Sequence, residues 1–182
     1  MTVAELPTIP ETLPVPQPAA DGEAKQGGLA IICYSGDLEK TWAAMILAST
    51  AGAMGMPTKV FVTFWGLQTF VKKGKRVTGE NWMQKMLSIM SRPGIAHRKL
   101  SKMNFLGMGP WMMRSLAKTY NVSSPAELLE MAKMLGVEFI PCQMTMDMFG
   151  IKYEDLMEGM GEPVGAATYL GFVADGASPL FI

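Results

Sequence analysis

The two cysteines carry the most distinctive chemistry in this chain, and each follows an apolar run typical of a β-strand. Cys33 ends the run "LAII", and Cys142 ends "VEFIP". Pro141 cannot donate a ladder hydrogen bond, so it favours the end of the strand just before Cys142. A helix is predicted to start at the next residue, and the free N–H groups of a helix N-terminus stabilise a thiolate. Two interpretations of Cys142 follow: a reactive thiol or a buried small hydrophobic residue.

The two thiols are expected to differ in role. Asp147 and Glu154 follow Cys142 closely in sequence and oppose its ionisation, which predicts only a moderately lowered pKa. Cys33 follows a wholly apolar run, which favours core packing over a role as a second thiol. If the two strands are neighbours, a disulfide becomes feasible, because it needs Cα atoms within about 7 Å of each other.

The polar residues next to these strands are the other site candidates. Ser35, Gly36 and Asp37 form a predicted turn after the first strand, with Asp37 as the N-cap of a helix from Leu38. Together with Gln143 they are predicted to line the site.

Several other kinds of site find no support in the sequence. With His97 as the single histidine and no CxxC or HExxH motif, neither a metal nor a cofactor is expected. The chain also lacks the GxGxxG phosphate-binding motif and the GxSxG motif of hydrolases. His97 lies in the basic segment "GIAHRKLSK", which is expected to be exposed.

Composition also limits the expected partners and the cellular location of the protein. Sixteen basic and sixteen acidic residues cancel, so nucleic acid is not an expected partner. Two cysteines and an N-terminus without the pattern of a signal peptide indicate a reducing, cytoplasmic location. Eighteen methionines are typical of an adaptable core or a large subunit interface.

The order of predicted elements defines the fold class. Residues 1–27 carry five prolines and are predicted to be a disordered tail, followed by one domain over residues 28–182. Strands and helices alternate in this domain, which predicts a three-layer α/β/α fold with a mainly parallel sheet of about five strands. The expected strands are 29–34, "VFVTFW", "VEFIPC" and "PLFI". The expected helices cover 38 onward, 78–90, the segment between the Ser124 capping box and Gly136, a short stretch from 143, 152–160 and "VGAATYLGFVADG".

Two apolar regions allow more than one interpretation. Residues 41–71 contain a single charge, Lys59, so a membrane hairpin competes with a strand–helix–strand unit, which the small residues and the "GMP" break favour. Residues 103–113 crowd large apolar side chains around Gly and Pro. This segment is either local core packing, a lid over a site or an oligomer surface, and we expect self-association through it.

Three long segments carry a family resemblance that covers residues 28–182. "SGDLEKTWAAMILASTAGAMGMPTKVFVTFWGL", "VEFIPCQMTMDMFGI" and "GAATYLGFVADGASPLFI" resemble the DsrE/DsrF/DsrH-like family and its DsrE2-type branch. The resemblance implies a compact α/β/α fold, oligomers, and sulfur trafficking through a cysteine persulfide. It implies TusA-like or rhodanese-like carriers as partners, and the sulfur-bearing cysteine falls on Cys142. Relatives are also called peroxiredoxin-like, but "FIPC" lacks the threonine that a peroxidase needs three residues before its cysteine.

Three functional hypotheses follow from the residues and the resemblance. The first is a sulfur carrier or sulfurtransferase that works through Cys142, which needs an accessible, partly ionised thiol. The second is a non-catalytic oligomeric assembly module. The third is a membrane-associated relative with residues 41–71 as a hairpin, and peripheral membrane contact is a further expectation.

Overall fold

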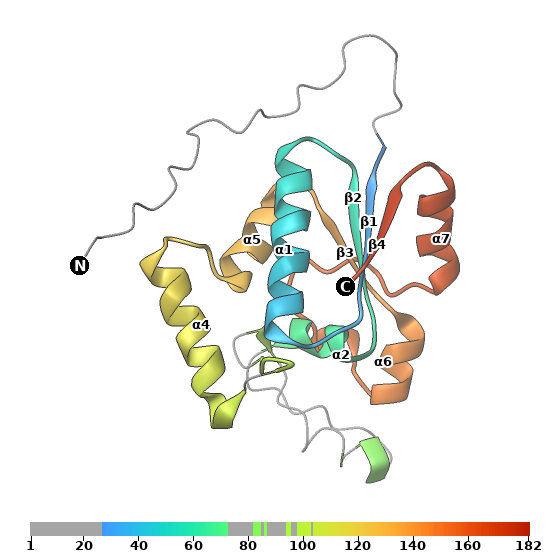
Figure 1. Ribbon diagram of the computed structural model, residues 1–182. Coiled ribbons are helices and arrows are strands. Elements are labelled where there is room, and N and C mark those ends of the chain that lie inside the picture. Colours follow the sequence, from blue (N-terminus) through green and yellow to red (C-terminus); the bar gives the residue numbers. More distant parts are fainter. Residues whose placement is uncertain (1–26, 73–81, 85, 87–93, 96–97, 103) are drawn as a thin grey trace, which may run out of the picture.

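The computed structural model of the chain describes residues 27–72, 82–84, 86, 94–95, 98–102 and 104–182 (Figure 1). The predicted N-terminal tail up to residue 26 lies outside the described residues. The same holds for His97, for Met103 and for most of the helix predicted over 78–90.

Four strands form the sheet of the described chain, and all of their pairings are parallel. They are β1 (Leu29–Cys33), β2 (Thr58–Val62), β3 (Glu138–Pro141) and β4 (Ser178–Phe181). The strand order is β3-β2-β1-β4, with Cys33 aligned to Val62 and Val62 aligned to Pro141. The predicted parallel α/β fold is therefore confirmed, with four strands described where about five were expected.

The helical elements connect these strands. They are α1 (Leu38–Ala53), α2 (Phe64–Leu67), η1 (Gln68–Phe70), η3 (Phe105–Gly107), α4 (Met108–Thr119), α5 (Pro125–Met134), α6 (Gln143–Phe149), η4 (Tyr153–Asp155) and α7 (Ala166–Ala174).

Helices cover both faces of the sheet, as Figure 1 shows, with α1 and α5 on one face and α7 on the other. Side chains alternate along each strand, so neighbouring residues enter different cores. Ile31 and Cys33 belong to the larger core beneath α1 and α5, whereas Ala30 and Cys142 belong to the smaller core beneath α7. The predicted three-layer arrangement follows from this alternation.

Residues 41–71 form α1, β2, α2 and η1, so the alternative of a membrane hairpin is wrong. Thr41, Ala44 and Ala48 on α1 have no exposed surface, because this helix packs on the sheet and on α5. Small residues allow that close approach: a Cβ at Gly52 would lie 2.9 Å from the Cβ of Leu135. Within the described part of the chain, every helix is too short or too polar to cross a bilayer.

The strand predicted as "VFVTFW" ends earlier than expected. β2 stops at Val62, and Phe64 begins α2. The Gly66 N–H donates to the Tyr34 carbonyl (2.8 Å), and a Cβ at Gly66 would collide with the Cys33 carbonyl. The backbone after β2 therefore turns tightly over the end of β1 instead of continuing the sheet.

The prediction of a helix over residues 152–160 is wrong, because these residues form only the single 3₁₀ turn η4. The Lys72 N–H donates to the Asp155 carbonyl (2.8 Å), and the Met157 N–H donates to the Phe70 carbonyl (2.8 Å). These tertiary bonds use the backbone groups that a continuous helix would need for itself.

The capping box before α5 is confirmed. The Ser124 N–H donates to the Glu127 carboxylate (2.7 Å), and the Glu127 N–H donates to Ser124 Oγ (3.3 Å). Gly136 follows the helix with a φ of 80°, a left-handed conformation that favours glycine. Local sequence thus fixes both ends of this helix.

Candidate functional site

Cys142 occupies the N-cap position of α6, directly after β3. Its N–H donates to the Val62 carbonyl (2.9 Å), and its own carbonyl accepts from the Met146 N–H (3.0 Å). A β-bridge to Val164 holds its other side. Because neighbouring segments fix its backbone, the thiol is held at the carboxyl edge of the sheet, where sites of parallel α/β folds form.

Two threonines flank this thiol, one from each neighbouring element. Thr63 follows β2, and Thr145 is the third residue of α6. Their hydroxyls share a buried hydrogen bond of 2.9 Å, in which either can donate, and Thr145 Oγ1 also accepts from the Phe64 N–H (3.2 Å). Each hydroxyl has one proton, so when one donates to the other, the second keeps its proton for the sulfur.

The environment favours the thiolate of Cys142. Burial raises the pKa of this thiol and is the largest single effect. The Thr145 hydroxyl and N–H, the Thr63 hydroxyl and the Met144 N–H together outweigh it, so the pKa of Cys142 is lower than its ordinary value. The Cys142 side chain makes no cap hydrogen bond to the N–H groups of α6 when it is protonated. The hydroxyl and N–H donors therefore stabilise the thiolate and not the thiol. The direction of this shift agrees with the prediction from the sequence, but the effect that opposes ionisation is burial and not the carboxylates of Asp147 and Glu154.

Phe64 holds a strained backbone next to this donor set. Its φ is 46°, a left-handed conformation that costs a non-glycine residue roughly 1–2 kcal/mol. That conformation directs the Phe64 N–H to Thr145 Oγ1. The strain therefore accompanies the turn that brings Thr63 beside Thr145.

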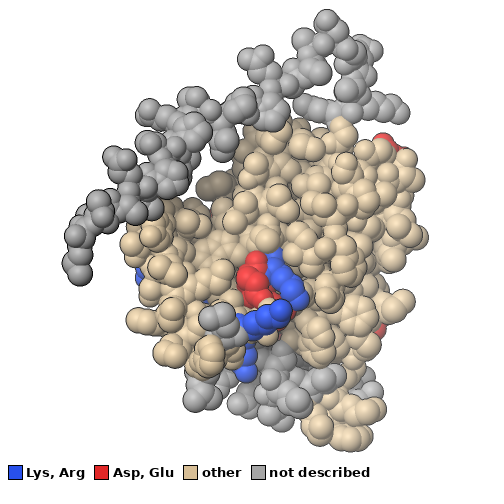
Figure 2. All heavy atoms as spheres, in the orientation of Figure 1, with Lys and Arg blue, Asp and Glu red and all other residues tan. Residues whose placement is uncertain are grey.

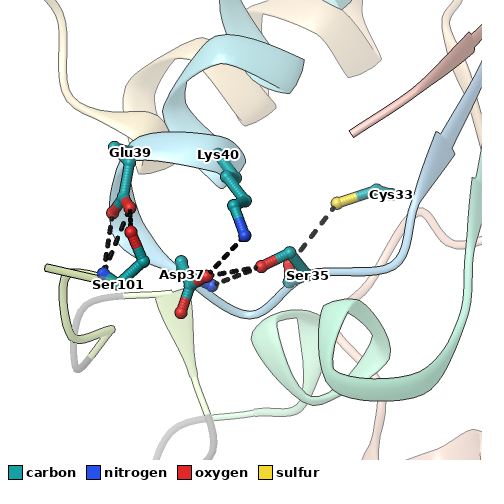
Figure 3. Close-up of polar contacts among 6 residues, drawn as sticks. All are labelled: Cys33, Ser35, Asp37, Glu39, Lys40 and Ser101. Atoms are coloured by element: carbon teal, nitrogen blue, oxygen red, sulfur yellow. Dashed lines mark hydrogen bonds and ion pairs between the residues drawn. The ribbon is translucent and has the colours of Figure 1, made fainter.

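Cys33 lies in a different environment at the end of β1 (Figure 3). The residue is 1 % exposed, and its Sγ makes one long contact of 4.0 Å to the Ser35 carbonyl. Burial raises the pKa of Cys33 to about 12, although the nearby Arg98 guanidinium acts in the opposite direction. Cys33 is therefore a protonated core residue, which agrees with the core-packing interpretation.

The polar residues after Cys33 bond mainly with one another. Ser35 Oγ donates to Asp37 Oδ2 (2.9 Å), the Asp37 N–H donates to Ser35 Oγ (3.2 Å), and Lys40 pairs with Asp37 (2.9 Å) (Figure 3). Asp37 is the N-cap residue of α1, as predicted, but its carboxylate makes no cap hydrogen bond. It is engaged by Ser35 and Lys40 instead of the helix N–H groups.

Arg98 is the unexpected member of the Cys33 region. It lies in the segment that the sequence suggested was exposed, yet it is 8 % exposed. Its guanidinium donates to the carbonyls of Gln68 (2.8 Å) and Gly94 (3.3 Å), and burial lowers the pKa of Arg98 to about 10. A Cβ at Gly36 would lie 2.8 Å from this guanidinium, so Gly36 serves close packing.

The two thiols cannot form a disulfide in this fold. β2 lies between their strands, and neighbouring strands are about 4.8 Å apart, so the Cα atoms are about 10 Å apart. Cys33 aligns through Val62 with Pro141, so Cys142 points to the opposite face of the sheet. Their membership in different cores agrees with this.

The predicted site residues therefore fall into two groups at the carboxyl edge. Ser35, Gly36 and Asp37 lie with Cys33. Gln143 adjoins Cys142 in sequence, but its exposed side chain donates to Asp147 Oδ1 (2.8 Å). Among the described residues, His, Cys, Asp and Glu side chains form no group of three that would hold a metal ion.

Sequence reasoning missed the two threonines beside Cys142. Thr145 carried a usable local signal, because the N-cap side chain faces the N–H and side chain of the third helical residue. Thr63 carried no such signal, because it lies far from Cys142 in sequence and only the pairing of β2 with β3 brings it close.

One ionisable thiol at the carboxyl edge of a parallel, three-layer α/β fold is the feature that defines this molecule. The DsrE/DsrF/DrsH-like family matches residues 25–181, and the chain belongs to that family. The chain is 35 % identical over 161 residues to the "Sulfur carrier protein DsrE2" of Allochromatium vinosum, covering 87 % of this chain and 99 % of that protein.

Two further similarities were found. The chain is 37 % identical over 152 residues to the "Uncharacterized protein YrkE" of Bacillus subtilis, covering 84 % of this chain and 94 % of the relative. A solved structure, the protein of unknown function MTH1491 from Methanobacterium thermoautotrophicum, aligns with a TM-score of 0.41 and 11 % identity over 85 % of this chain and 99 % of that one. At that TM-score the likeness adds nothing to the family membership.

Proposed function

We propose that this protein carries sulfur for a trafficking pathway, with Cys142 holding a sulfane sulfur as a persulfide. Its family and its relative named a sulfur carrier support the class of function. The observation that carries the proposal is the set of donors around Cys142, which lowers its pKa despite burial. Cys33, with its pKa raised to about 12, has no comparable support.

Loading would be a thiolate exchange without net oxidation. The Cys142 thiolate attacks the outer sulfur of a donor persulfide, a new S–S bond forms, and the donor's S–S bond breaks. The bonding electron pair leaves with the donor sulfur as a thiolate. In unloading, an acceptor thiolate attacks the outer sulfur and Cys142 leaves as a thiolate. Thr63 and Thr145 stabilise that thiolate at both stages, since a low pKa also improves a leaving group.

The surface around Cys142 suits contact with a partner protein. Phe64 and Trp65 on α2, and Met144 and Met148 on α6, are between 45 % and 77 % exposed. Exposed aromatic and methionine side chains are enriched at protein interfaces. TusA-like or rhodanese-like carriers remain the partners implied by the resemblance. A homo-oligomer and a cytoplasmic location likewise remain predictions.

Intact mass spectrometry after treatment with a low-molecular-weight persulfide tests the proposal. Wild type is expected to gain sulfur that dithiothreitol removes, Cys142→Ser none, and Cys33→Ser somewhat less than wild type. Equal uptake by wild type and Cys142→Ser would contradict the proposal. Oligomers of both proteins with no sulfur uptake by wild type would favour the assembly-module alternative.

A further inference from the structure

An apolar groove lies between helices α1 and α4. Figure 1 shows α4 on the outer side of α1. The groove has a volume of about 450 Å³, which is within the usual range of ligand-binding pockets. Two aromatic and four other apolar side chains are among those that line it, from Trp42, Ile46, Met113, Leu116, Tyr120 and Val122. Packing of the described residues therefore leaves an apolar, partly aromatic hollow on the surface of the domain.

The floor of this groove is fixed, and its walls are open to solvent. Trp42 is 5 % exposed, and its Nε1–H donates to the Ser123 carbonyl (2.9 Å), which holds the indole in place. On the α4 side, Leu116 is 54 % exposed and the C-cap residue Tyr120 is 74 % exposed, and Ile46 of α1 is 43 % exposed. A segment bound in the groove would therefore bury exposed side chains of both helices.

The groove carries little charge. In Figure 2, charged side chains gather mainly near the start of α1, and most of the surface over α4 is uncharged. Among the described residues that line the groove, Glu39 is the charged one, and its carboxylate accepts from the Ser101 N–H and hydroxyl. Because burying a charge is costly, an uncharged apolar segment suits this groove better than a charged one.

Residues 6–10, "LPTIP", are an uncharged apolar segment with two apolar–proline pairs three residues apart. Pro-rich segments favour the polyproline II conformation, which has three residues per turn. With that period, positions 6, 9, 12 and 15 share one edge, with Leu, Ile, Thr and Val, and positions 7, 10, 13 and 16 share the next, with Pro, Pro, Leu and Pro. The third edge, at positions 8, 11, 14 and 17, carries Thr, Glu, Pro and Gln. The sequence therefore places two adjacent apolar edges opposite a more polar one.

We infer that the groove between α1 and α4 binds residues 6–10 of the same chain in the polyproline II conformation. Aromatic-lined grooves are the sites that recognise such segments, because the preformed conformation loses little entropy on binding. The two apolar edges would face Trp42 and Leu116, and the polar edge would face solvent. The Tyr120 hydroxyl can donate to a backbone carbonyl, which a polyproline II segment leaves free. The inference does not depend on the sulfur chemistry of Cys142.

The length of the chain permits this contact. Five residues of polyproline II extend about 15 Å, and the 12 residues of α4 extend about 18 Å. The chain enters β1 beside the end of α1, because the Leu29 N–H donates to the Pro57 carbonyl (2.8 Å). Ile46 lies seven residues before the end of α1, about 10 Å along the helix axis. Residues 11–26, which link the segment to the domain, can span up to about 50 Å.

The covalent link favours binding within one chain. A flexible link of this length gives the segment an effective concentration on the order of 1 mM. If the groove binds the free segment with a Kd of about 0.1 mM, the tethered segment occupies it about 90 % of the time. At micromolar protein, a second copy supplies its segment at a concentration roughly a thousandfold lower than the tether does.

Limited proteolysis of the full chain with a glutamate-specific endoproteinase tests whether the groove is occupied. The bound segment should protect the bond after Glu11, whereas the bond after Glu23, within the link, serves as an internal control. Tyr120→Ala and Leu116→Ala should each weaken binding about tenfold, since one apolar side chain is lost from the contact. The free fraction then rises from about 9 % to about 50 %, so cleavage after Glu11 should become about fivefold faster while cleavage after Glu23 stays unchanged.

Leu170→Ala is the matched control variant, since Leu170 is 61 % exposed on α7, on the opposite face of the sheet. It should be cleaved as wild type is, and circular dichroism should show that all variants are folded. Equal cleavage after Glu11 in wild type and in both groove variants would overturn the inference.

Photo-crosslinking identifies the occupant of the groove. With Ile9 replaced by p-benzoylphenylalanine, illumination of the full chain is expected to link this position, within one chain, to peptides that contain Ile46 or Met113. Links that join two chains and increase with protein concentration would assign the groove to a second copy and overturn binding within one chain. Links that lie only outside the groove, or no links at all, would overturn the inference as well.

Discussion

Cys33 ends β1 and Cys142 directly follows β3 at the carboxyl edge of one parallel sheet, yet their thiols have opposite tendencies to ionise. Burial raises the pKa of Cys33 to about 12. Burial also opposes ionisation of Cys142, but hydroxyl and N–H donors outweigh it there. A position at the end of a strand therefore places a thiol at the carboxyl edge of the sheet. The hydrogen-bond donors of the neighbouring elements then determine whether that thiol ionises and can act as a nucleophile.

The faces of the sheet explain why the donors reach one thiol and not the other. Cys142 points toward the smaller core, beside Thr63 and the first turn of α6. Cys33 points into the larger core, where Ser35 and Asp37 bond to each other and Arg98 bonds to backbone carbonyls. The Cys33 region thus uses its polar groups to fix a turn, whereas the Cys142 region directs them at sulfur.

Alkylation of the native protein should show the largest difference between the two thiols. With a pKa near 12 instead of 9.0, Cys33 has about a thousandfold less thiolate than an unperturbed thiol, and it is buried as well. Iodoacetamide at pH 7 is therefore expected to label Cys142 at least about a hundredfold faster than Cys33. Peptide mass mapping over time gives both rates, and denatured protein is the control, in which both thiols should react alike. Similar alkylation rates of Cys33 and Cys142 in the native protein would show that the two thiols do not differ in ionisation and access.

Substituting the threonines should make Cys142 behave more like Cys33. Valine keeps the shape of threonine but removes the hydroxyl, so Thr63→Val and Thr145→Val should each raise the pKa of Cys142. The alkylation rate at pH 7 is expected to fall about tenfold for either variant. Thr69→Val is the matched control, because the Thr69 hydroxyl is buried and has no hydrogen-bond partner in the described chain. If Thr69→Val slows alkylation of Cys142 as much as Thr63→Val and Thr145→Val do, the hydroxyl donors are not the cause of the lowered pKa.

The raised pKa of Cys33 also predicts how stability depends on pH. Above pH 9 the unfolded thiol ionises while the folded thiol stays protonated, so the unfolded state binds fewer protons and stability falls as pH rises. Wild type should lose about 1.4 kcal/mol more than Cys33→Ala between pH 8 and pH 10. Urea denaturation of both proteins at the two pH values measures this difference. Parallel losses would show that Cys33 titrates normally.

Local patterns predicted those elements whose stabilising contacts are also local. The capping box at Ser124, the glycine stop at Gly136 and the strand before Cys142 all form as expected. Residues 41–71 form a helix and a strand as predicted, because small residues and a Gly-Met-Pro break fit a helix packed on a sheet better than a membrane span.

Most of the failures come from contacts between distant segments. The predicted helix at 152–160 is replaced by backbone pairing with residues 70–72. The predicted Asp37 cap differs, because local bonds to Ser35 and Lys40 take the carboxylate away from the helix N–H groups. Thr63 reaches Thr145 because β2 and β3 are neighbours, and the buried Arg98 bonds to the backbone of η1, which is 30 residues away in sequence. A single sequence carries no periodicity that would report such pairs.

The most direct test of the account is to locate the sulfur on the loaded wild-type protein. After treatment with a small persulfide, alkylation of the accessible persulfide and peptide mapping will show which cysteine gained the atom. The account predicts the extra sulfur on the peptide containing Cys142 and an unmodified thiol on the peptide containing Cys33. Extra sulfur on Cys33, or shared equally between the two cysteines, would contradict it.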